Sequence, residues 1–169
     1  MIIDFHTHVF SPKVIEQRQQ YVENDPSFGM LYADPKAKLI TAEQLIESMD
    51  TAGIDMSVIL NIGWMEHETC VETNDYILAS IARYPKRLIG FCALQPNSTG
   101  ASVREIERCA KAGARGFGEI RPDMQMIDFA AVEVLGPVFD AMKQHNMILL
   151  THSSEPIGHY YQGKGAVTP

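Results

Sequence analysis

The sequence predicts an α/β fold of parallel strands and alternating helices, of the TIM-barrel (β/α) type, with about five of the eight units of a full barrel. Two observations support this. Five short apolar runs rich in β-branched and aromatic residues are separated by amphipathic stretches. From the second run onward, the runs begin about thirty residues apart, as in a barrel of about 250 residues. We therefore expect residues 1–169 to form one domain, a partial barrel.

Each expected strand has apolar residues on both faces, as a parallel sheet covered on two sides requires. The strands are expected at Ile2–Phe5, Met56–Ile62, Leu88–Leu94, Arg115–Ile120 and Met147–Thr151. Side chains alternate between the two faces of a strand. The first strand is therefore expected to direct His6 and His8 inward. It is expected to direct Ile3 and Phe5 outward against the helices.

Local chemistry indicates where the intervening helices begin and end. Thr41–Gln44 forms a capping box, and Gly53 closes that helix because glycine adopts the left-handed turn at little cost. The second helix, at about residues 72–84, ends before a proline, which cannot continue a helix. The third ends at Gly113 and the fourth near Asn146.

Residues 10–40 separate the first strand from its helix and are expected to form a long loop, with a short helix around residues 14–22 as an option. Loops that follow strands form the catalytic face of a barrel, so this one is a candidate lid or pocket wall. Five units would leave two open sheet edges, so we expect the chain to lack the C-terminal part of the barrel. The alternative is a complete five-stranded domain of flavodoxin-like build.

Composition and charge limit the function classes. The formal net charge of −7 argues against a nucleic-acid partner, since such partners normally require a basic surface. The three cysteines show no metal-knuckle spacing or disulfide framework, and we find no export signal or membrane-length apolar run. We expect a cytoplasmic protein with a small-molecule substrate and no membrane partner. An exposed sheet edge would favour a homo-oligomer.

Three histidines are candidate ligands of one divalent metal ion. His6 and His8 share one face at the end of the first strand, so their imidazoles can approach a common ion. His152 follows the fifth strand, and the carboxyl ends of parallel strands meet at one edge. Three protein ligands plus water is the open arrangement of a catalytic zinc site. We therefore predict zinc, or another divalent ion, at this edge.

Four further residues are candidate site residues. Glu119, at the end of the fourth strand, is a catalytic candidate that could bridge a second metal or accept a hydrogen bond from a ligand histidine. The alternative for Glu119 is an ion pair with Arg121. Arg121 could instead bind a substrate carboxylate in a bidentate fork. Trp64 and His159 follow strands and could contact substrate, although rim packing and a surface position are their simpler interpretations.

These motifs resemble a known family. The Asp-x-His-x-His of the first strand, residues 4–8, the Gly-Glu-Ile at residues 118–120 and His152 are similar to the amidohydrolase superfamily. The likeness is greatest to its amidohydrolase-2 group, which includes aminocarboxymuconate-semialdehyde decarboxylase. The resemblance implies that His6, His8 and His152 are metal ligands. The family also uses a histidine after strand six and an aspartate after strand eight, so this chain alone would lack catalytic residues.

The resemblance implies a metal-dependent hydrolase in which zinc-activated water attacks a carbonyl of a small molecule. Three alternatives stay open. The first is a zinc-dependent, non-oxidative decarboxylase of the same family. The second is a nuclease similar to the TatD-type metal-dependent DNases, which share the first-strand His-x-His and the Gly-Glu-Ile. The third is a non-catalytic fragment or binding domain in which the histidines are incidental.

Overall fold

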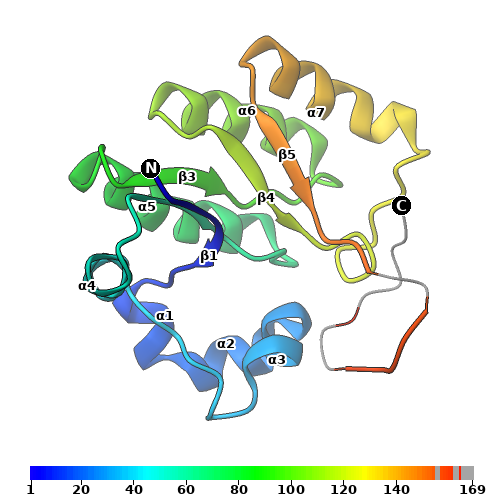
Figure 1. Ribbon diagram of the computed structural model, residues 1–169. Helices are drawn as coiled ribbons and strands as arrows, with labels where there is room; N and C mark the ends of the chain where they lie inside the picture. Colours follow the sequence, from blue (N-terminus) through cyan, green and yellow to red (C-terminus); the bar gives the residue numbers. More distant parts are fainter. Residues whose placement is uncertain (155–156, 162–163, 165–169) are drawn as a thin grey trace.

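The computed structural model describes residues 1–154, 157–161 and 164 (Figure 1). Its five strands are all parallel and form one sheet in the order β1-β2-β3-β4-β5. The strands are β1 (Ile3–His8), β2 (Met56–Leu60), β3 (Leu88–Cys92), β4 (Gly116–Ile120) and β5 (Ile148–Thr151). The sheet curls into half of a barrel, with helices packed along its outer side (Figure 1). The predicted partial (β/α) barrel is thus confirmed.

Four helices connect and cover the strands. They are α4 (Ala42–Ala52), α5 (His67–Arg83), α6 (Thr99–Lys111) and α7 (Val132–Gln144). The main core lies between them and the sheet, where Ile59 and Phe117 from the strands meet Leu45, Ile106 and Val138 from the helices. Each helix therefore buries one apolar stripe against the outer face of the sheet. No described helix combines the length and the apolar character of a bilayer-spanning segment.

The predicted helix ends agree with the observed ones in most places. The Thr41 hydroxyl accepts the Gln44 amide, and the Gln44 side chain accepts the Thr41 amide, which is the predicted capping box. Gly53 ends α4 with φ 70° in the left-handed region, and Asn146 follows α7 with φ 51°. Helix α5 begins at His67 and so is longer than the predicted helix at residues 72–84.

The segment at residues 10–40, expected to be a long loop with a short helix around residues 14–22 as an option, is more helical than expected. It contains α1 (Pro12–Glu16), α2 (Arg18–Asn24) and α3 (Pro26–Tyr32). Ser11 and Asp25 cap α1 and α3 with their side chains, and a proline occupies the first turn of each. Phe28 of α3 stacks on Trp64 with ring centroids 5.1 Å apart. These helices therefore pack beyond the carboxyl end of β2, against Trp64 in the segment that follows it.

A β-bulge changes the expected face of one side chain. The pairing of β1 with β2 shifts register between Asp4 and Thr7, which breaks strict alternation along β1. Phe5, expected to point outward against the helices, instead contacts Phe91 edge-on, with ring centroids 6.1 Å apart. Phe91 belongs to the apolar cluster of the inner face, together with Val58. The prediction for Phe5 is therefore wrong, because the bulge inserts one residue into β1.

Glycine in β4 permits close approach between elements on the inner face. A Cβ added at Gly116 would lie 2.5 Å from the Ile148 carbonyl oxygen and 2.7 Å from the ring of Phe91. A Cβ at Gly118, with φ 149°, would lie 2.5 Å from the Leu150 carbonyl oxygen. Because these neighbours include main-chain atoms of β5, a side chain could be accommodated only by moving the strand.

We expect Gly116→Ala to lower the free energy of unfolding by about 1–3 kcal/mol, because the added methyl group forces β4 and β5 apart. Urea unfolding followed by circular dichroism measures this loss. Gly100→Ala is the matched control: Gly100 lies in α6, and its nearest neighbour is the Arg104 guanidinium at 3.8 Å. The control should be neutral or slightly more stable, since alanine favours a helix. Equal stability of the two variants would contradict the close approach.

Candidate metal centre

Two histidines and one glutamate converge at the carboxyl edge of the sheet. His6 and His8 lie at the end of β1, and Glu119 lies at the end of β4. The Nε2 atoms of the two histidines are 3.1 Å apart, and Oε2 of Glu119 lies 3.4 Å from Nε2 of His6 and 3.7 Å from Nε2 of His8. In the sheet order, β2 and β3 separate β1 from β4, so the curl of the sheet creates this meeting.

The electrostatics of the three groups suit a cation. Burial and the neighbouring His6 lower the pKa of His8 to about 4, so His8 is neutral at neutral pH. Burial opposes ionisation of Glu119, but hydrogen bonds from His6 and His152 outweigh it and lower its pKa to about 2. The hydrogen bond to Glu119 raises the pKa of His6 above its usual value. One carboxylate and two imidazoles therefore share a small, partly buried space.

The donor set fits a divalent metal ion. One ligand atom from each of His6, His8 and Glu119 lies within 4.8 Å of the other two. Two imidazole nitrogens and one carboxylate oxygen are a recurrent protein ligand set for zinc and for other first-row transition metals. Nitrogen and oxygen lone pairs at such short range repel one another unless a proton or a cation lies between them. The geometry can therefore hold a metal while leaving positions open for other ligands.

His152, predicted as the third metal ligand, lies beside Glu119. Its Nδ1 is 2.8 Å from Oε1 of Glu119, and its Nε2 is 3.3 Å from Oγ of Ser154. Because Glu119 is a carboxylate with a low pKa, His152 Nδ1 is the donor in this bond. Within the described part of the chain, the compact group comprises the other two histidines and Glu119. Direct ligation by His152 stays a prediction.

The structure shows which side chain partners Glu119 at the end of β4. Glu119 was expected to bridge a second metal, to accept a hydrogen bond from a ligand histidine or to pair with Arg121. The structure shows a hydrogen bond with His152, whose own metal ligation stays a prediction. Arg121 instead faces Asp123, with Nη2 3.0 Å from Oδ2 and Nε 3.3 Å from Oδ1. The pair between Glu119 and Arg121 does not form, because the chain turns after β4 and places Asp123 against the guanidinium.

The three predicted substrate contacts occupy different environments. Arg121 is only 3% exposed, and its guanidinium already binds Asp123. Trp64 is fully buried in an apolar cluster and donates its Nε1 hydrogen to Oδ1 of Asn61 at 2.8 Å. His159 is exposed, and its ring lies 6.1 Å from that of Tyr161. Their contacts with substrate stay predictions.

Main-chain contacts behind Glu119 were not predicted from the sequence. The Glu119 amide donates to the Asn61 carbonyl at 2.8 Å, which joins the ends of β2 and β4 directly. Gln125 accepts the Arg121 amide and donates to the carbonyls of Trp64 and Leu94. The signal available in the sequence was Asn61, an uncharged polar residue directly after the apolar β2, whereas nothing comparable marks Gln125. Uncharged polar residues at such positions often satisfy buried main-chain groups.

Solved structures with the same fold include a 5-carboxyvanillate decarboxylase from Novosphingobium aromaticivorans with bound manganese. It is 21% identical, with a TM-score of 0.74 over 90% of this chain and 51% of that one. A probable 2-pyrone-4,6-dicarboxylic acid hydrolase from Acinetobacter baumannii is 19% identical, with a TM-score of 0.58 over 90% and 49%. A 4-oxalomesaconate hydratase from Rhodopseudomonas palustris is 20% identical, with a TM-score of 0.63 over 90% and 52%.

The chain thus spans about half the length of these structural neighbours. Each match covers 90% of this chain, in agreement with the half-barrel form of the sheet. At the level of sequence, the amidohydrolase family (Amidohydro_2) matches residues 3–165, which include the histidines of β1, Glu119 and His152. This chain therefore belongs to the amidohydrolase family.

Proposed function

We propose that this chain provides the metal site of a metal-dependent enzyme that acts on a small carboxylated or cyclic molecule. The observation that carries the proposal is the convergence of His6 Nε2, His8 Nε2 and Glu119 Oε2 within 3.1–3.7 Å. A solved neighbour with the same fold contains manganese. The ion here is therefore proposed to be Zn²⁺, Mn²⁺ or another first-row divalent ion, because the mixed nitrogen and oxygen set accepts several of them.

Each residue has a distinct part in this proposal. His6 and His8 present neutral imidazole nitrogens, and Glu119 presents a carboxylate oxygen, once the proton of His6 is displaced. His152 donates from Nδ1 to Oε1 of Glu119, which leaves Oε2 directed at the histidines of β1. A bound divalent ion supplies Lewis-acid chemistry, polarising a carbonyl group and making water more acidic. His152 and Ser154 provide a hydrogen-bonded path beside it.

The reaction is proposed to be hydrolysis, with non-oxidative decarboxylation as the second candidate. Both need a Lewis acid beside a carbonyl or carboxylate group. The decarboxylase candidate is favoured by the bound-manganese decarboxylase among the structural neighbours. Products distinguish the two, because hydrolysis adds the mass of one water molecule and decarboxylation removes that of carbon dioxide. The net charge of −7 disfavours a nuclease, since a phosphate backbone would be repelled.

Metal titration tests the proposed site without a known substrate. In calorimetry, Zn²⁺ and Mn²⁺ should each bind with one ion per chain. Binding to the folded state alone should raise the melting temperature, since an ion at a hundred times its Kd stabilises a protein by about 2.7 kcal/mol. Ca²⁺ is the control ion, because it prefers oxygen ligands and should bind far more weakly to two imidazoles. Absence of saturable Zn²⁺ or Mn²⁺ binding would contradict the proposal.

A further inference from the structure

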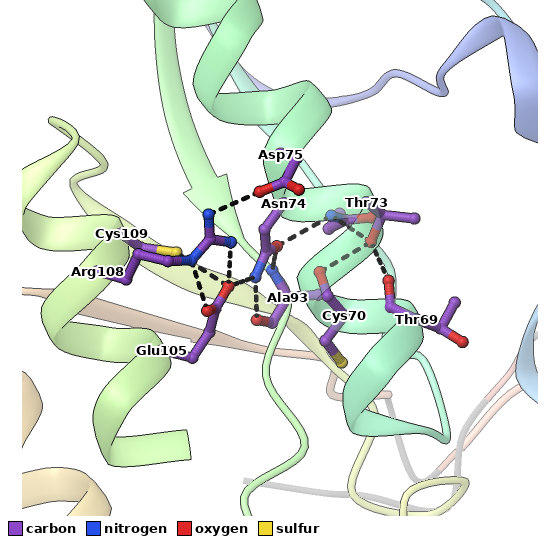
Figure 2. Close-up of polar contacts among 10 residues, drawn as sticks. Thr69, Cys70, Thr73, Asn74, Asp75, Ala93, Glu105, Arg108 and Cys109 are labelled. Carbon is purple, nitrogen blue, oxygen red and sulfur yellow. Dashed lines mark hydrogen bonds and ion pairs between the residues drawn. The ribbon is translucent and has the colours of Figure 1, made fainter. Parts of the chain in front are cut away.

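Behind the metal centre lies a buried polar network that runs from α6 through α5 to the ends of β2 and β3 (Figure 2). At its outer end, Arg108 donates hydrogen bonds to both carboxylate oxygens of Glu105. The distances from Nε to Oε2 and from Nη2 to Oε1 are each 2.8 Å. Arg108 also binds Asp75 at 2.6 Å. Glu105 is 4% exposed, and hydrogen bonds from Arg108 and Asn74 keep its pKa low although burial opposes ionisation. The network thus begins with a fixed, ionised carboxylate.

Asn74 is the centre of the network, and it uses its full hydrogen-bonding capacity. Its Nδ2 donates to Oε1 of Glu105 at 2.8 Å and to the Ala93 carbonyl at 3.0 Å. Its Oδ1 accepts the Ala93 amide at 2.5 Å and Nδ2 of Asn61 at 3.2 Å. Figure 2 shows the Asn74 amide lying between Glu105 and Ala93. A fully buried amide with four partners has one orientation, so Asn74 fixes the position of Asn61.

Asn61 connects this polar network to the candidate metal centre. Besides the bond to Asn74, its Nδ2 donates to Oγ1 of Thr73 at 3.0 Å, and its Oδ1 accepts from Trp64. Its main-chain carbonyl accepts the amide of Glu119 at 2.8 Å. Asn61 is 2% exposed, so water does not replace any of these partners cheaply. The side-chain hydrogen bonds fix the position of Asn61, and the Asn61 carbonyl in turn binds the main-chain amide of Glu119.

We propose that Asn61, held by Thr73 and Asn74, is a positioning residue that sets where the Glu119 carboxylate meets the two histidines. The expected effect on metal affinity rests on the proposed function, whereas the hydrogen bonds that position Glu119 do not depend on it. The geometric basis is the chain of contacts from Asn74 and Thr73 to Asn61, and from the Asn61 carbonyl to the Glu119 amide. Residues that orient metal ligands typically change metal affinity by about 10–100-fold when removed.

The experiment compares Asn61→Ala with wild type by two readouts. The first is amide hydrogen exchange by NMR, in which the Glu119 amide of the variant should exchange at least about tenfold faster than in wild type. The second is Co²⁺ affinity, which should fall by about tenfold or more, with an altered visible absorption spectrum. Loss of local protection without metal binding by wild type would defeat the proposed function and leave the positioning role standing.

Two milder variants keep the test decisive if Asn61→Ala does not fold. Thr73→Val removes the hydroxyl that binds Asn61 while keeping the side-chain shape. Ser80→Ala removes a buried hydroxyl from the same helix, where Oγ of Ser80 donates to the Tyr76 carbonyl at 2.7 Å, away from Asn61. Only Thr73→Val should speed exchange at Glu119 and weaken Co²⁺ binding. Unchanged exchange at Glu119 in Thr73→Val and Asn61→Ala, or equal changes in Ser80→Ala, would overturn the proposal.

Discussion

His8→Ala is expected to weaken binding of Zn²⁺ and Mn²⁺ by more than about a hundredfold, because it removes one of three convergent ligand groups. His8 is the informative choice, since burial lowers its pKa to about 4 and makes it a ready ligand at neutral pH. Protons therefore compete little for this nitrogen above pH 5. Calorimetric titration of the variant at pH 7.5 measures the loss.

His145→Ala is the matched control for the His8 variant. His145 follows α7 and belongs to no described group of metal-ligating side chains. The control should bind one ion with the affinity of wild type. His152→Ala gives a graded comparison: it should weaken binding less than His8→Ala if His152 acts mainly through Glu119. If His8→Ala binds the ion with wild-type affinity, the proposed site is wrong. If His8→Ala and His152→Ala lose equal affinity for the ion, direct ligation by both histidines is favoured.

Trp64→Ala should lower the free energy of unfolding by about 3–5 kcal/mol, a large share of the stability of a domain of this size. Trp64 is fully buried and stacks on Phe28, with an interplanar angle of 12° and centroids 5.1 Å apart. Truncation would leave a cavity between α3 and the strand ends. Chemical unfolding followed by far-ultraviolet circular dichroism measures the effect, since the variant lacks the only tryptophan.

Trp64→Phe separates packing from hydrogen bonding at the same position. Phenylalanine keeps an aromatic surface against Phe28 but removes the donor to Oδ1 of Asn61. We expect it to cost about 1–3 kcal/mol through the unsatisfied oxygen, less than the alanine variant. A loss below about 1 kcal/mol in Trp64→Ala would contradict the packing role that the structure gives this side chain.

The strands could be predicted from the sequence because their signals are local. Each run of apolar residues on both faces became a strand, and the capping box at Thr41 and the left-handed Gly53 were confirmed where predicted. The residues of the candidate metal centre could also be chosen, because parallel strands bring their carboxyl ends to one edge. Residue type, together with a position at the ends of expected strands, therefore identified both histidines of β1 and Glu119 as candidates.

The remaining features depend on contacts that periodicity does not encode. The bulge in β1 shifts Phe5 to the inner face, and nothing local in the sequence marks the inserted residue. The helices of residues 10–40 are short, so their stability comes from packing, as that of Phe28 against Trp64 shows. The arrangement in which Glu119 meets the histidines while His152 stands behind it depends on sheet curvature, which only the folded chain defines.

The placement of these ligand groups has a mechanical consequence. Within the sheet, β1 pairs only with β2, whereas β4 lies two strands further along. Yet side chains of β1 and β4 approach to 3.4 Å at the carboxyl edge. An ion bound there would link two strands that share no hydrogen bonds. Metal binding would then be thermodynamically coupled to the curvature of the sheet. Binding of an ion would favour the curved sheet, and flattening of the sheet would weaken the binding of the ion.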